Sequence, residues 1–314
     1  MEAIGGYFEL ELRKGKHYHE NALRLNSARN AFEYILRVRN YKKIYIPYYT
    51  CEVMLQPLKK LGIEYEFYHI KSDLEPTKLP TLKTNEAFLY TNYFGLKQAT
   101  VQKLSEVYHT QLIIDNSQAF FAPPINGIDT FYSARKFFGV ADGAYLYTDK
   151  LLDEKLTQDK SYNRMLHLLQ RIDEGAESAF SIFQNNDRAL DDQPIKLMST
   201  LTDRILCGIN YQEVIERRRE NYIYLSERLS SGNYLEDSLT DNAVPMIYPY
   251  FTNIQNIKEK LISQKIFIPT YWTNVQKWCQ KSDFEYLLML RLAAIPIDQR
   301  YGKKEMEKII RCLL

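Results

Sequence analysis

The first half of the chain alternates between two patterns of hydrophobic and polar positions. Short apolar runs are typical of buried strands, and the segments between them repeat apolar residues at the spacing of a helix face. The predicted strands are 43–47, 65–70, 86–92 (followed by a turn to residue 95), 112–115 and 143–148, and the predicted helices are 27–36, 53–61 and 100–109. Strands that alternate with helices in this way predict an α/β fold, in which a mostly parallel sheet has helices on both faces.

The second half is less clearly divided by its pattern. Residues 151–205 are mostly helical in pattern, and a long helix is predicted at 212–229. The charged run 217–220 within that helix is predicted to face solvent. Residues 235–314 are typical of a small α+β unit. The other predicted features are loops at 185–187 and 191–194, strands at 246–250 and 267–269, and helices at 256–263 and 303–313.

The length of 314 residues suits one large and one smaller domain. We expect a large α/β domain at 1–205 and a small C-terminal α+β domain at 206–314, which includes the connecting helix. Residues 7–12 alternate between apolar and polar types and are predicted to form a further strand. Apolar residues make up 45% of the chain and charged residues 25%, as in ordinary globular proteins.

Composition argues against several classes of function. The formal net charge of +2 gives no overall field that would attract nucleic acid or an anionic membrane. The four cysteines form no C-x-x-C pair, which argues against zinc sites and disulfide frameworks. His17 and His19 lack a third ligand nearby, so they are interpreted as polar surface residues and no metal site is predicted. With neither a signal peptide nor a long apolar run, we expect a cytoplasmic protein.

The candidate chemistry centres on an acid and a lysine. Asp115 ends the apolar run 112–115, as a residue at the carboxyl edge of a buried parallel strand would. Lys136 lies beyond the next strand-like segment. A carboxylate that holds a pyridine nitrogen protonated and a lysine that forms a Schiff base are the two groups that pyridoxal phosphate (PLP) requires. The pair therefore predicts a PLP site.

Four local motifs, in order, resemble the DegT/DnrJ/EryC1/StrS sugar aminotransferase family of fold type I PLP enzymes. Residues 25–32 resemble its phosphate loop, which opens a helix at the N-cap Ser27. Residues 46–51 resemble its strand–P-x-x-T–helix segment, and 114–119 resemble its E-D-x-x-Q-A segment. Residues 133–136, followed by Asp142 and Gly143, resemble its lysine segment.

The resemblance implies roles for individual residues. Lys136 would be the catalytic lysine, and Asp115 would pair with the pyridine nitrogen. Gln118 and Asn92 would lie near the ring hydroxyl, and Cys51 stands where the family commonly has an aromatic residue that stacks on the ring. At the phosphate, the expected contacts are Ser133, Ala28 and Arg29.

Some positions depart from the family pattern. Ala28 and Arg29 replace the glycine usual in the phosphate loop, where glycine lets the backbone approach closely. Ser133 precedes the lysine by three positions, as in amino-acid aminotransferases, whereas the sugar family usually has its serine five before. Residues 194–199 lack the asparagine of the segment that a partner subunit contributes in the family.

The resemblance implies an aminotransferase that moves an amino group from a glutamate-like amino acid to a keto group of a nucleotide-linked sugar, as in polysaccharide biosynthesis. It also implies a homodimer. A PLP enzyme acting on a small amino or keto acid is one alternative, which the spacing of Ser133 and Lys136 supports. A non-catalytic binding or regulatory protein that retains the fold is the other, and the altered loop and stacking positions favour it.

Overall fold

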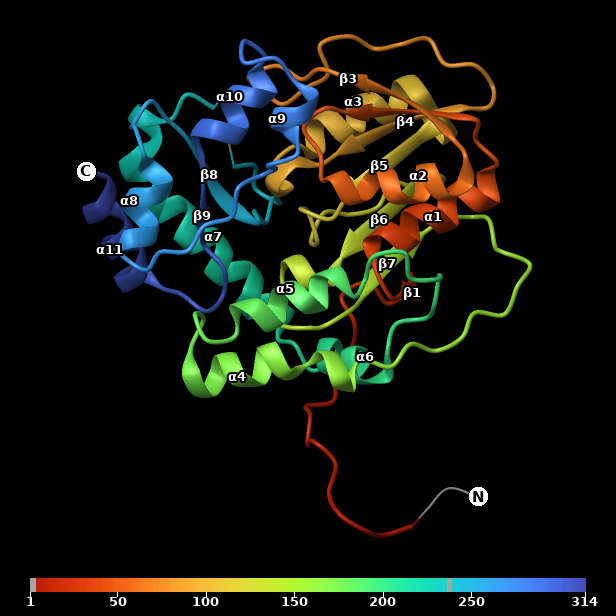
Figure 1. Cartoon of the computed structure of the whole chain (residues 1–314), viewed down its shortest axis with the longest axis horizontal. Helices are drawn as coiled ribbons and strands as arrows, with labels where there is room; N and C mark the ends of the chain where they lie inside the picture. The colour runs from red at the N-terminus through yellow and green to blue at the C-terminus, as the bar shows by residue number, and fades with distance from the viewer. Residues whose placement is uncertain (1–3, 236–238) are drawn as a thin grey trace.

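A seven-stranded sheet organises the computed structural model, which describes residues 4–235 and 239–314 (Figure 1). Its strand order is β1-β7-β6-β5-β4-β2-β3. The strands β2 to β6 run parallel, while β1 and β7 are antiparallel to their neighbours. The strands are β1 Leu23–Leu25, β2 Lys43–Pro47, β3 Glu64–Tyr68, β4 Glu86–Thr91, β5 Leu112–Asn116, β6 Asp129–Ser133 and β7 Ala144–Tyr147. The predicted mostly parallel α/β sheet is confirmed.

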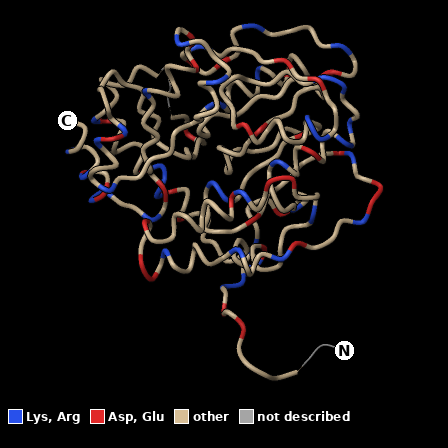
Figure 2. Tube along the Cα trace, viewed as in Figure 1, with Lys and Arg blue, Asp and Glu red and all other residues tan. Residues whose placement is uncertain are grey.

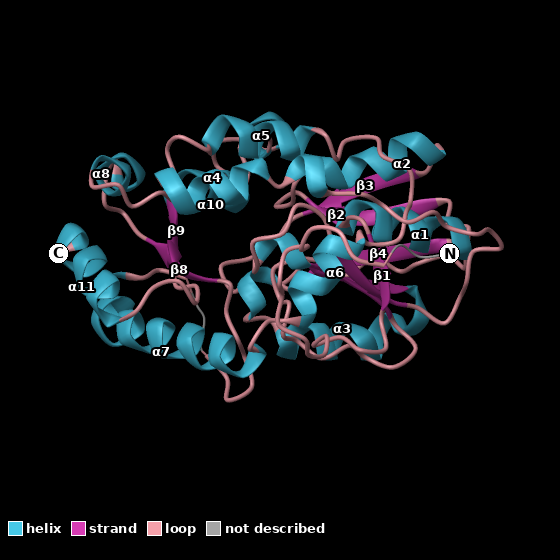
Figure 3. Cartoon of the chain, turned by 90° about the horizontal axis from the view of Figure 1, so that it is seen from below, coloured by secondary structure: helices cyan, strands magenta, loops and turns pink. Residues whose placement is uncertain are grey.

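Alternate residues of the central strands enter two different cores. In β5, Ile113 packs with the apolar face of α1 and α2, whereas Leu112 and Ile114 pack into the larger core on the other face. Because side chains alternate along a strand, burial of both faces requires a nearly continuous apolar run. This explains why 86–91 and 112–116 are buried throughout, and why their pattern predicted buried strands. Figure 3 shows helices on both sides of the sheet.

Two helix boundaries of the first half lie at residues that the sequence indicated, whereas α1 continues to Arg39, three residues beyond its predicted end. Ser27 caps α1 (Ala28–Arg39), since its Oγ accepts from the amide N–H of Asn30 at 3.2 Å. Gly62, with φ of +63°, ends α2 (Leu55–Leu61). At the far end of α1, the guanidinium of Arg39 donates to both carboxylate oxygens of Asp129, at 2.7 and 2.8 Å. This ion pair fixes α1 against β6. The next helix is α3, Gln98–Tyr108.

The second half forms a smaller unit around the two-stranded antiparallel sheet of β8 (Ile247–Phe251) and β9 (Leu292–Pro296). Figures 1 and 3 both place this sheet to one side of the large one, flanked by α7, α8, α10 and α11. The helices are α4 Leu166–Glu174, α5 Phe180–Arg188, α6 Thr200–Cys207, α7 Tyr211–Leu229, α8 Ile257–Ser263, α9 Val275–Trp278, α10 Phe284–Arg291 and α11 Lys303–Leu313. The division into domains at residue 205 stays a prediction.

Three local predictions were wrong. Residues 7–12 form no strand, because they lie exposed with no sheet edge beside them. Residues 267–269 are not paired into the β8–β9 sheet and lie outside any strand. Residues 185–187, expected in a loop, belong to α5. Local alternation or polarity decided each prediction, whereas strand pairing and helix packing depend on distant residues.

Charges of both signs are interspersed along the chain, in agreement with its near-zero balance (Figure 2). Among the described residues, no helix combines the length and apolarity that a membrane crossing would need.

His17 and His19 are not polar surface residues, as the sequence suggested, but lie 7% and 2% exposed. His17 Nδ1 lies 2.7 Å from the hydroxyl of Tyr145, and His19 Nε2 lies 2.7 Å from the carbonyl oxygen of Phe120. Burial lowers the pKa of both imidazoles, that of His19 to about 4. Neutral imidazoles therefore anchor the N-terminal segment onto β7.

The lowered pKa of His19 predicts acid lability. At pH values above 6.5, the ordinary pKa of histidine, the imidazole of His19 is neutral in both the folded and the unfolded chain. Its titration therefore takes nothing from the free energy of unfolding in this range. As the pH falls from 6.5 to 4, only the unfolded chain takes up the proton, and stability falls by about 3 kcal/mol. His19→Phe should flatten this slope in urea titrations at pH 7.5, 5.5 and 4.5. The exposed His109→Asn serves as control, and equal slopes for wild type and His19→Phe would contradict the prediction.

Candidate active site

Three parallel strands bring the predicted acid and lysine to one edge of the large sheet. β4, β5 and β6 are neighbours, and Thr91 is the register partner of Asp115. Lys136 ends the short helix η4 (Ala134–Lys136), which directly follows β6. Because the carboxyl ends of parallel strands meet at one edge, this edge is where an open α/β sheet places its ligands.

Asp115 is held rigidly at the end of β5. Its Oδ1 accepts from the amide N–H of Ser117 at 2.8 Å, and its Oδ2 accepts from the hydroxyl of Thr91 at 3.4 Å. Burial raises the pKa of this carboxyl, while these hydrogen bonds and the charge of Lys136 oppose the shift. A cation placed against Asp115 would lower the pKa of this carboxyl again, so the position favours a positively charged partner.

Lys136 is exposed at the surface of the site, and its Nζ lies 5.9 Å from the ring centroid of Tyr271. Its charge also acts on Cys51, which links the 46–51 segment to the same place. Burial raises the pKa of the Cys51 thiol, and Lys136 and Arg29 lower it. The structure therefore brings both Asp115 and Cys51 within electrostatic reach of Lys136.

The other residues expected around a ring differ in their contacts. Gln118 is 2% exposed, and its Oε1 accepts from the amide N–H of Phe94 at 2.9 Å. Its Nε2 is buried and has no partner among the described residues. Asn92 instead donates to Gln98 and accepts from the amide N–H of Lys97, both at 3.0 Å. Gln118 thus keeps a free donor, while Asn92 holds the turn after β4.

The start of α1 is cationic but already paired. Ala28 and Arg29 form its first turn, and the guanidinium of Arg29, 9% exposed, donates to the carboxylate of Asp191 and to Gln56. Ser133 ends β6, next to η4, and is mostly buried. The cation and the hydroxyl expected around a phosphate, those of Arg29 and Ser133, are therefore present. The carboxylate of Asp191 already pairs with the cation.

Asp187 and Asp191 are site residues that the sequence did not indicate. Asp187, at the end of α5, accepts from Arg135 at 2.9 Å, and Lys136 and Arg29 also help to lower the pKa of its carboxyl. Both acids lie more than 50 residues beyond Lys136 in the chain, inside a segment that was predicted to be irregular. The ion pairs of Asp187 with Arg135 and of Asp191 with Arg29 place the two acids here, and no local sequence pattern indicates such long-range contacts.

A third unforeseen residue is Arg218, which was predicted to face solvent but is 1% exposed. Its guanidinium lies 4.6 Å from the ring centroid of Phe137, and its Nε donates to Gln299 at 3.1 Å. Gln299 in turn donates to the carbonyl oxygen of Phe137 at 2.8 Å. Phe137 directly follows Lys136, so two residues of the C-terminal half hold the lysine segment in place.

Comparisons with known proteins were made by sequence and by structure. No protein-family model and no curated protein matches the sequence. Solved structures do match, each at 13% identity: a DegT DnrJ EryC1 StrS aminotransferase from Brucella abortus (TM-score 0.58, 93% of this chain and 84% of that one), Spr1654 from Streptococcus pneumoniae in its PMP form (0.64, 93% and 86%), and DesI in the presence of its TDP-sugar product (0.63, 93% and 79%).

The chain has the fold of these aminotransferases. The fold type I architecture expected from the four motifs is confirmed over nearly the whole chain. The residues also fit PLP at its ring: Asp115 suits a protonated nitrogen, and Gln118 Nε2 is a buried donor without a partner among the described residues. At the phosphate end, Arg29 and Arg135 would have to exchange carboxylates for phosphate oxygens.

Loss of the Gln299 side-chain amide should destabilise the lysine segment. Gln299→Leu keeps the volume but leaves the carbonyl of Phe137 and the Nε of Arg218 unpaired, which should lower the free energy of unfolding by about 2 kcal/mol. Urea unfolding measures this loss, with the exposed Gln276→Leu as matched control. If both variants unfold like wild type, Gln299 does not support Phe137.

Proposed function

We propose that this protein is a PLP-dependent aminotransferase that moves an amino group from a glutamate-like amino acid to a keto group of a nucleotide-linked sugar. The observation that carries the proposal is the placement of Asp115 and Lys136 on one sheet edge, with the charge of the lysine acting on the acid. PLP, when bound, supplies an electron sink for breaking bonds at the amino-bearing carbon.

The residues of this chain divide the remaining work. Asp115, oriented by Ser117 and Thr91, would accept a hydrogen bond from the protonated ring nitrogen of PLP and keep that nitrogen charged. Gln118 presents its free Nε2 to the ring side of the site. Lys136 would hold the cofactor through its Nζ and, once the amino donor has displaced that nitrogen, would move a proton between neighbouring carbon atoms. Its exposure gives the side chain room to move between these two tasks.

The substrate class follows from the resemblance and from the neighbours. DesI is a structure determined with a TDP-sugar product, and several matching chains are sugar aminotransferases. The four motifs of this chain resemble the same family. A nucleotide-linked sugar is therefore the proposed acceptor.

A second candidate is a binding protein that keeps the fold without the chemistry. The ion pairs of Arg29 with Asp191 and of Arg135 with Asp187 favour it, because carboxylates compete with a phosphate dianion for the same cations. The two candidates differ in whether PLP attaches to Lys136.

Colour separates the two candidates. With added PLP, the wild-type protein should gain an absorbance band at the violet edge, and borohydride should abolish the band and leave the cofactor mass on the peptide that contains Lys136. Glutamate should bleach the band if the protein transfers amino groups. Lys136→Ala should show neither effect, while Lys150→Ala, an exposed lysine elsewhere, should behave like wild type.

Asp115→Asn refines this test. It should still bind PLP but react with glutamate at least about a hundredfold more slowly, because the ring nitrogen loses its counter-charge. A wild-type protein that stays colourless at saturating PLP would reject the aminotransferase and favour the binding protein.

The homodimer implied by the resemblance is also part of the proposal. The hairpin of α4 and α5 exposes a row of large apolar side chains, and Leu169 and Ile172 are 53% and 81% exposed. Figures 1 and 3 both show the two helices side by side at the edge of the molecule. Such contiguous apolar faces are rare on monomers and common at interfaces. The exposed apolar residues of this hairpin are Leu166, Leu169, Ile172, Phe180 and Phe183.

Ile172→Glu tests whether this face joins two copies. Light scattering should give twice the chain mass of 37.1 kDa for wild type and a single chain mass for the variant, since a buried unpaired carboxylate opposes association. Ile223→Glu, at an isoleucine of α7 that is 44% exposed, should remain dimeric. A monomeric wild type, or a dimeric Ile172→Glu, would contradict this assignment.

A further inference from the structure

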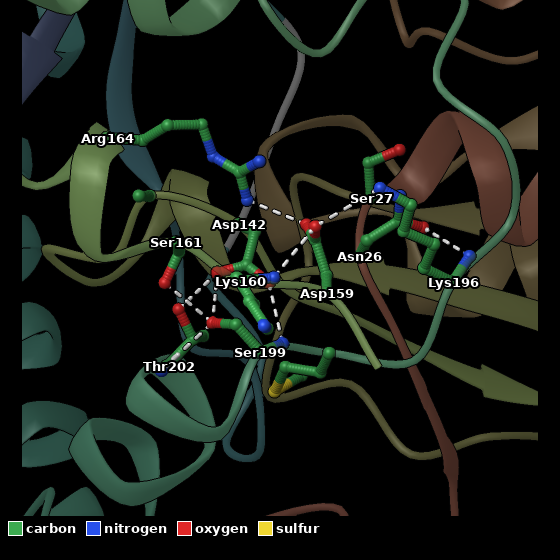
Figure 4. Close-up of polar contacts among 12 residues, drawn as sticks. Asn26, Ser27, Asp142, Asp159, Lys160, Ser161, Arg164, Lys196, Ser199 and Thr202 are labelled. Atoms are coloured by element: carbon green, nitrogen blue, oxygen red, sulfur yellow. Dashed lines mark hydrogen bonds and ion pairs between the residues drawn. The ribbon is translucent and has the colours of Figure 1, made fainter. Parts of the chain in front are cut away.

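Asp159, Lys160, Arg164 and Lys196, all labelled in Figure 4, form a second cluster of charged side chains. They line a cavity of about 450 Å³. Its walls come from 157–164 and from 189–196, and neither Asp115 nor Lys136 lines it. The volume falls within the range of about 300–1,000 Å³ that is usual for small-molecule sites.

The cavity carries more positive than negative charge. Lys160, Arg164 and Lys196 line it together with one carboxylate, that of Asp159, which leaves a surplus of two positive charges (three minus one). Asp159 lies 2.6 Å from Arg164 and 3.5 Å from Lys196, and it is 6% exposed. It therefore orients two of the cations. The Nε of Arg164 is buried, and among the described residues it has no hydrogen-bond partner.

Hydrogen bonds join the two walls of the cavity, and Asp159 holds two of its three cations in position. The amide N–H of Asp159 donates to the carbonyl of Leu197, and that of Leu197 donates to the carbonyl of Thr157. Next to them, the hydroxyls of Ser161 and Ser199 lie 2.6 Å apart, and Ser199 donates to the buried Asp142 (Figure 4). A prearranged set of donors binds an anion with little loss of side-chain freedom.

We propose that this cavity binds the phosphate group of a small polyhydroxylated phosphate ester, such as a sugar phosphate. A phosphate monoester carries nearly two negative charges at neutral pH, which matches the surplus of two positive charges in the cavity lining. Hydroxyl and amide side chains from Thr157, Asn163 and Gln193 supply partners for sugar hydroxyls. The lining contains no aromatic side chain on which a base could stack, so the lining favours a sugar phosphate over a nucleotide.

The experiment titrates glucose 1-phosphate and inorganic phosphate into the protein at constant ionic strength, with heat of binding as the readout. Both should bind saturably, and glucose should not. Lys160→Gln should weaken binding about tenfold, because one charged donor is lost. Lys160 is exposed and its ammonium makes no ion pair in the described structure, so this substitution leaves folding intact. Lys150→Gln, outside the cavity, controls for net charge.

Arg164→Gln should weaken binding at least as much, with circular dichroism as a check that the chain is folded without the partner of Asp159. Lys136→Ala and Arg135→Gln should each bind both probes like wild type, which separates this site from the lysine and from the phosphate end of the proposed aminotransferase site. Three results would each overturn the assignment: no saturable binding, equal affinity in wild type and Lys160→Gln, or an equal loss in Lys150→Gln.

Discussion

The parallel register of β4, β5 and β6 is the constraint on which the candidate site depends. It aligns Thr91 with Asp115 and places the lysine segment directly beyond the next strand, at the same edge. Strands β4 and β5 are buried on both faces. A register slip of one residue would move every side chain of the strand from one core into the other, which disrupts the packing of both cores. The cost of such a slip keeps the acid and the lysine in place more firmly than any contact between them.

The C-terminal half takes part in the site through a buried cation. Arg218 packs on the ring of Phe137 and binds Gln299, and Gln299 holds the carbonyl of Phe137. Burial lowers the pKa of Arg218 to about 10, which still leaves it charged at neutral pH. A buried charge is tolerated only where polar groups surround it, and here the carbonyls of Pro245 and Met246 complete the set. The position of the lysine segment therefore depends on the packing of both halves.

The sequence predicted what depends on local pattern. The apolar run 112–115, the N-cap Ser27 and the glycine after α2 can each be recognised from neighbouring residues alone. The same holds for the alternation of strands with helices. Arg218 and His19 were misjudged because a polar residue in a polar run is normally exposed. Their partners lie on other elements, more than 25 residues away, as with Pro245 and Phe120. No periodicity encodes such a pairing.

The segment from α5 to residue 196 connects the two cationic regions of the molecule. Asp187 and Asp191 face the cations beside α1 and η4, whereas Ala189 and Gln193 line the cavity on its other side. Carboxylates that neutralise one set of cations can be displaced by an anion of higher charge, since a phosphate offers more acceptors to the same guanidinium groups. An anion that enters beside α1 would compete for these two ion pairs, while the side-chain amides of Asn30 and Asn26 still donate to the carbonyls of Gln193 and Pro194 and hold this wall of the second cavity. The two regions are thus linked by one stretch of backbone.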